Sequence, residues 1–134
     1  MSVLRGLRLG PDQGLYTYCS FTLVVTLSGL PSGSVLSQGW LTVKNSPQDA
    51  DGSAVLAKNI TTTLVAGVGQ ITDTGASDQS GSMTFLFSAA QMAALTANQS
   101  YAWDCKVMYD TGEVLPVVED SQMTPGQAIT RDYT

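Results

Sequence analysis

Hydrophobic and polar residues alternate along much of this chain, and a period of two is the pattern of a strand with one buried face. Residues 19–27 and 100–110 show this alternation most clearly. The first segment places Cys19 on its apolar face, and the second places there Tyr101, Trp103, Cys105, Val107 and Tyr109. Further strands are expected at residues 39–44, 54–58, 60–65, 70–72, 83–87, 114–119 and 127–133.

Turn residues separate these segments at spacings of about ten residues, which is typical of a Greek-key sandwich or barrel. One segment departs from the pattern. Ser88 and Gln91 form a capping box before an alanine-rich stretch, which predicts one short helix at about 88–95. Pro116 lies within an expected strand and indicates a sheet edge or a bulge there. The sequence therefore predicts an all-β domain of about seven or eight strands with one short helix.

The N-terminal stretch lacks this alternation and contains glycine, proline and regularly placed leucine. We expect residues 1–15 to form an arm and residues 16–134 to form a single β-sandwich domain, because 134 residues is the size of one domain. Pairing of the arm along a sheet edge is the binding mode that we expect. The candidate protein-binding residues of the arm are Val3, Leu4, Leu7 and Leu9.

Charge is sparse, since only 13% of the residues are charged, about half the usual share in soluble domains. Such a chain suits a β-protein that hides much of its surface against neighbours. The net charge is −5 and the basic residues are scattered, so we expect no direct nucleic-acid binding and no membrane binding. The sequence shows neither an apolar run long enough to span a bilayer nor a signal peptide, which predicts synthesis in a cytoplasm.

Catalytic and cofactor motifs are scarce. The chain contains no histidine, which removes the common nucleophilic triads, and its two cysteines cannot form a Cys₄ zinc site. We therefore expect no enzymatic activity, no cofactor and no metal. Asp49 and Asp51 share a loop, and Asp104 lies near Asp110, which allows a calcium loop or a glycosidase pair. The chemistry of tight turns is the favoured interpretation of these carboxylates.

Cys19 and Cys105 both fall on faces expected to point inward, which leaves two alternatives. They form a disulfide between two strands, with Trp40 or Trp103 packed nearby as in immunoglobulin domains, or they remain buried thiols. Synthesis in a cytoplasm favours thiols. The apolar face of residues 100–110 likewise serves either as core or as a sugar platform, and core is the commoner use.

Several short motifs of the C-terminal half carry a family resemblance. They are FSAAQMAAL at 87–95, YAWDCKV at 101–107, DTGEV at 110–114 and QAITRDYT at 127–134, and LTVK at 41–44 before the Asp49 loop fits the same pattern. Over roughly residues 20–134 the chain resembles the small immunoglobulin-like domain at the N-terminus of phage baseplate upper proteins and related tail-fibre proteins. The resemblance implies an immunoglobulin-like Greek-key β-sandwich that docks onto a virion, often within an oligomer and without catalysis.

In that family a fibre or receptor-binding part usually follows the domain, and none follows it in this sequence. We therefore expect a bacteriophage virion structural protein that binds other virion proteins, made in the bacterial cytoplasm and located in the particle. A tail or baseplate adaptor or fibre anchor, and a capsid cement or decoration protein, both remain open. The alternative is a carbohydrate-binding module for host attachment, which exposure of Trp40, Tyr16 or Tyr133 favours.

Overall fold

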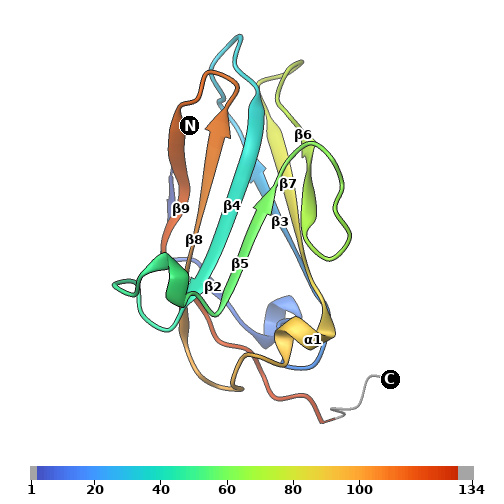
Figure 1. Ribbon diagram of the computed structural model, residues 1–134, viewed down its shortest axis with the longest axis vertical. Helices are drawn as coiled ribbons and strands as arrows, with labels where there is room; N and C mark the ends of the chain where they lie inside the picture. Colours follow the sequence, from blue (N-terminus) through green and yellow to red (C-terminus); the bar gives the residue numbers. More distant parts are fainter. Residues whose placement is uncertain (1–2, 130–134) are drawn as a thin grey trace.

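The computed structural model describes residues 3–129 and shows two β-sheets packed face to face (Figure 1). The six-stranded sheet contains β1 (Leu4–Arg5), β2 (Arg8–Leu9), β4 (Leu36–Lys44), β5 (Leu56–Ile60), β8 (Tyr101–Tyr109) and β9 (Val114–Met123). The three-stranded sheet contains β3 (Phe21–Leu27), β6 (Gly69–Asp73) and β7 (Gly81–Phe87). The expected all-β sandwich is confirmed.

The strand order is that of an immunoglobulin-like Greek key. The larger sheet runs β1-β9-β8-β4-β5, with β2 also on β9, and the smaller sheet runs β3-β7-β6. Strands β9, β8 and β4 thus take the G, F and C positions of an immunoglobulin domain, β5 takes C′, and β3, β7 and β6 take B, E and D. Among the described residues no strand takes the A position beside β3, because β1 and β2 pair in parallel with β9 instead.

The core lies between the two sheets and follows the period-two pattern. Inward side chains from both sheets are fully buried, among them Leu41, Val43, Met83, Phe85 and Val107. Each large apolar side chain of this kind stabilises the fold by about 2 kcal/mol. The aromatic face of β8 belongs to this core, since Tyr101, Trp103 and Tyr109 are each at most 4% exposed.

The short helix α1 (Ala89–Met92) begins at the expected capping box. Ser88 Oγ accepts a hydrogen bond from Gln91 N (3.1 Å), and Gln91 Oε1 accepts one from Ser88 N (2.9 Å). The helix is shorter than the expected 88–95. After Met92 the backbone tightens into i→i+3 bonds, including Leu95 N to Met92 O (3.2 Å), and this turn still buries Leu95.

Three of the expected strands need correction. Residues 54–58 and 60–65 do not form separate strands, because one strand, β5, continues through Asn59 and ends at Ile60. Nor do residues 127–129 belong to a strand, and residues 130–134 of that expected element lie outside the described residues. Of the two features that Pro116 indicates, a sheet edge or a bulge, a bulge is present, because the pairing of β8 with β9 shifts register there.

Candidate protein-binding surfaces

The N-terminal arm expected from the sequence pairs with the edge of its own sheet. Backbone hydrogen bonds of 2.9 Å run from Gln122 N to Leu7 O and from Thr124 N to Leu9 O. Leu7 and Leu9 pack against the core, whereas Leu4 is 43% exposed and Val3 is half-buried. The four candidate residues therefore do not form one surface, and the arm's strands cover the β9 edge of the same chain.

Features that obstruct pairing with another chain are present at three sheet edges. The β9 edge is occupied by β1 and β2, which are themselves only two residues long. The β5 edge carries an inward-pointing charge, Lys58. At the β6 edge the preceding loop is bonded to the strand from Ile71 N to Thr61 O (2.8 Å), and a bulge follows Ile71.

The β3 edge lacks such protection. This seven-residue strand pairs on one side with β7 along its whole length. On its other side, no backbone or side-chain group of residues 3–129 forms a hydrogen bond with it. Its sequence FTLVVTL contains no charge, proline or glycine, and its register with β7 shows no bulge. A long, regular, uncharged edge is the type that pairs readily with another strand.

The outer face of the three-stranded sheet carries a charge only at its end, at Asp73, among the described residues. Alternation and register place on this face Thr22, Val24, Thr26, Gln70, Ser82, Thr84 and Leu86, all exposed or half-buried. The ionisable residue of these strands is Asp73 at the end of β6, which pairs with the outer-face residue Ser82 and is exposed. Its carboxylate accepts a 3.0 Å bond from Gly75 N. Most of this face therefore presents β-branched and small polar side chains.

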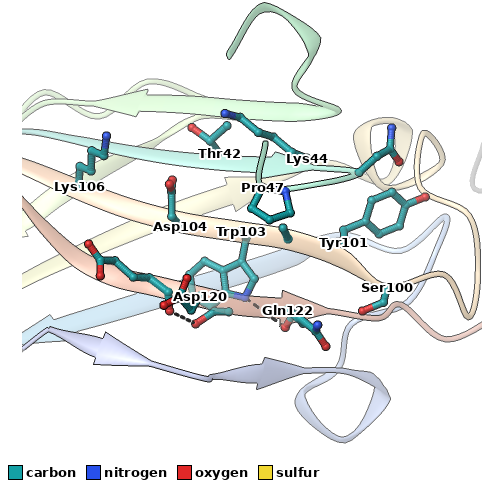
Figure 2. Close-up of a pocket in the computed structure, with 14 residues that line it drawn as sticks. Thr42, Lys44, Pro47, Ser100, Tyr101, Trp103, Asp104, Lys106, Asp120 and Gln122 are labelled. Carbon is teal, nitrogen blue, oxygen red and sulfur yellow. Dashed lines mark hydrogen bonds between the residues drawn. The ribbon is translucent and has the colours of Figure 1, made fainter. Parts of the chain in front are cut away.

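A hollow of about 670 Å³ lies on the outer face of the six-stranded sheet, and Figure 2 shows its lining. Residues of β4, β8 and β9 form it, together with the loop that contains Pro47. Its charged side chains are Lys44, Asp104, Lys106, Glu119 and Asp120. The two sheets therefore differ in character, since one outer face is charged and hollowed and the other is nearly uncharged.

Charges around the hollow are only partly paired. Lys44 Nζ donates to Asp51 Oδ1 (2.7 Å), which lowers the pKa of Asp51, and Arg5 contacts Glu119 at 3.0 Å. Asp104 forms no hydrogen bond or ion pair within the described residues. Burial raises the pKa of the Asp104 carboxyl, and the nearby ammonium groups of Lys106 and Lys44 partly oppose this effect. The hollow can thus offer one half-buried acceptor to a polar ligand.

The other carboxylates considered from the sequence serve turns. Asp49 Oδ2 accepts a 3.2 Å bond from Ser46 N, which is the turn role expected for it. Asp110 follows the last residue of β8 and accepts from Val35 N (3.3 Å). It lies roughly 20 Å along the strand from Asp104, which is too far for a glycosidase pair. Within residues 3–129 no group of three or more potential metal-binding side chains of the His, Cys, Asp or Glu type is found.

The two cysteines occupy different environments. Cys105 is fully buried, and burial raises its pKa to about 12, whereas Cys19 is exposed, and both are free thiols. The inward orientation expected for Cys19 is therefore wrong. Alternation begins only with β3 at Phe21, because Tyr18 adopts a left-handed backbone conformation (φ 61°) that interrupts the extended chain before it.

Lys58 is a buried polar residue that the sequence reasoning missed. Its side chain is 5% exposed, and Nζ donates to Gly67 O (2.6 Å) and to Gln91 Oε1 (2.8 Å). The signal was present in the alternation of Leu56, Lys58 and Ile60. It was overlooked because the strand was expected to end at Lys58.

The chain matches no protein-family model and no curated protein sequence. Among the described residues no helix is long and apolar enough to cross a membrane.

Proposed function

We propose that this protein is a bacteriophage virion structural protein, a non-enzymatic module that binds other virion proteins. The observation that carries the proposal is the outer face of the β3-β7-β6 sheet, which is uncharged except for Asp73 at the end of β6. In a chain of net charge −5, this face holds Thr, Ser, Val, Leu and Gln side chains. The cores of protein interfaces are depleted in charged residues, because charges are costly to remove from water.

The resemblance of the C-terminal motifs to phage baseplate and tail-fibre domains supports a place in the particle. In that setting the module serves as a tail or baseplate adaptor or fibre anchor, or as a capsid cement or decoration protein. Either position presents many copies of a partner surface in a symmetric array. Contacts made by uncharged side chains and main-chain groups are then expected to contribute most of the affinity.

Cryo-EM of purified particles tests this proposal directly. Density for the sandwich on the shell identifies a cement or decoration protein, and density on the tail identifies an adaptor or anchor. Absence of the chain from particles overturns the proposal.

A pair of matched variants tests which face binds. Thr84→Lys places a charge at the centre of the nearly uncharged face, and Thr42→Lys makes the same change beside the hollow on the opposite sheet. After thermal unfolding shows that both variants fold, we expect Thr84→Lys to be lost from particles and Thr42→Lys to be retained. Retention of both variants contradicts the assignment of this face.

A second candidate function, carbohydrate binding, is favoured by the hollow with its unpaired Asp104 carboxylate. Trp40 and Tyr16 are half-buried and do not line the hollow, and Tyr133 lies outside the described residues. The aromatic residues that do line it, Tyr101 and Trp103, are nearly fully buried. Calorimetric titration with host surface glycans tests this candidate, and binding that Asp104→Asn abolishes would support it.

A further inference from the structure

The unprotected β3 edge has a sequence pattern that is symmetric about its central residue. Around Val24 the chain reads apolar, Thr, apolar, Val, apolar, Thr, apolar, so that Thr22 and Thr26 are equivalent positions. Thr22, Val24 and Thr26 are exposed on the outer face, and Val24 is 55% exposed. A strand with this symmetry presents the same pattern of apolar and threonine side chains whether it is followed from its N-terminus or from its C-terminus.

We propose that β3 binds the β3 strand of a second copy of this chain, antiparallel and related by a two-fold axis at Val24. The two three-stranded sheets then join into one continuous six-stranded sheet. Backbone groups on the outer side of β3, which have no partner within residues 3–129 of one copy, then bond to the other copy. Two-fold symmetry is the commonest symmetry of protein oligomers.

The side-chain pairs across such a junction are compatible at every position. On the outer face Val24 lies opposite the second copy's Val24, and each Thr22 lies opposite a Thr26. Towards the core, Phe21 lies opposite Leu27 and Leu23 lies opposite Val25. Pairs of β-branched residues and of threonines stabilise antiparallel strands, whereas like charges placed opposite each other destabilise them.

Charge favours a second copy at this edge over a second copy elsewhere. Each chain carries a net charge of −5, so most approaches bring like charges together. Neither β3 nor its neighbour β7 contains a charged residue, and the junction therefore brings no like charges into contact. In immunoglobulin constant domains a strand fills the A position beside the strand that corresponds to β3. Residues 3–129 leave this position vacant, so the β3 strand of a second copy can occupy it.

Analytical ultracentrifugation of the full chain over a concentration series tests the pairing. We expect a monomer–dimer equilibrium in the wild type. Val24→Lys places two ammonium groups opposite each other and should weaken dimerisation by about tenfold or more. Thr72→Lys adds the same charge at the exposed far edge of the sheet, on β6, and should leave the dissociation constant within about twofold. A wild type that stays monomeric at about millimolar concentration, or equal losses in both variants, overturns the proposal.

A charge-swap experiment distinguishes edge pairing from a general effect of the substitution. Val24→Lys and Val24→Glu should each be monomeric alone and should form a heterodimer when mixed, because a Lys–Glu pair then faces across the axis. Hydrogen exchange should show the β3 amides that are not bonded to β7 protected in the mixture and exposed in each variant alone. A mixture that stays monomeric, or protection confined to other strands, contradicts the β3 assignment.

This self-pairing goes beyond the proposed function, because it needs no other virion protein. If the chain is absent from particles but its β3 dimer forms, the virion role fails and the pairing stands. If the chain is found in particles but remains monomeric and unpaired at β3, the self-pairing fails and the virion role stands.

Discussion

The Lys58 ammonium and the Gln91 side-chain oxygen lie 2.8 Å apart, joining the edge strand β5 to the cap of α1. Lys58 Nζ also donates to Gly67 O and lies 5.2 Å from the centre of the Phe87 ring. Within residues 3–129 no carboxylate forms an ion pair with it. This buried cation is therefore held by carbonyl dipoles and an aromatic face.

The burial of Lys58 predicts a pH dependence of stability. Burial lowers the pKa of Lys58 below its usual value of 10.5, so the unfolded chain binds more protons than the folded chain between the two values. Stability from this group therefore rises with pH over that window and is smallest below it. Urea unfolding from pH 7 to 10.5 should show the wild type gaining stability relative to Lys58→Met, while exposed Lys106→Met follows the wild type. Parallel curves for wild type and Lys58→Met contradict the prediction.

The dual role of Gln91 predicts that its replacement lowers the free energy of unfolding substantially. Gln91→Ala removes the bond to Lys58 and the cap of Ser88 N, and should lower the free energy of unfolding by about 1–3 kcal/mol. Gln13 caps the turn at Gly10 in the same way but is exposed and has no buried cation beside it. Gln13→Ala should therefore cost about 0.5 kcal/mol or less. Equal losses in chemical denaturation would show that capping alone explains the effect of Gln91.

Two buried tyrosines predict opposite results for the same substitution. The Tyr109 hydroxyl is buried without a hydrogen-bond partner in the described residues, so Tyr109→Phe should stabilise the protein by about 1 kcal/mol. The Tyr101 hydroxyl accepts a 2.7 Å bond from Thr96 N, so Tyr101→Phe should destabilise it by about 1 kcal/mol. Chemical denaturation measures both changes, and a loss of stability in Tyr109→Phe would contradict the first.

The different exposure of the cysteines predicts their reactivity. A water-soluble maleimide should label one thiol quickly in the native protein, and Cys19→Ser should abolish this fast phase. Cys105 should react only after unfolding, because it is buried and its raised pKa keeps it a neutral thiol. Mass spectrometry identifies the labelled site, and rapid native labelling of Cys105 would contradict the assignment.

The paired N-terminal strands predict a structural role for the arm. Deleting residues 1–9 removes the bonds to β9 and the packing of Leu7 and Leu9, and should lower the free energy of unfolding by a few kcal/mol. The uncovered β9 edge should also increase association, visible by light scattering. Unchanged stability and association would indicate that the arm contributes only weakly to the sheet.

The period-two pattern determined which side chains of β3, β7 and β8 are buried, because alternation in a strand is local geometry. The capping box fixed the start of α1, and Pro116 marked a bulge, for the same reason. These features depend on residues close together in the sequence, so the sequence alone was sufficient to predict them.

Other features depend on contacts between distant segments, and only the tertiary structure decided them. Lys58 is buried because α1 and the β5–β6 loop supply its acceptors, and residues 4–9 pair with β9, which lies more than a hundred residues later. The pairing of residues 4–9 with β9 covers the β9 edge and leaves these residues away from β3. The sequence therefore determined a β-sandwich and its core, whereas long-range pairing decided that β3 is the edge that residues 3–129 leave open.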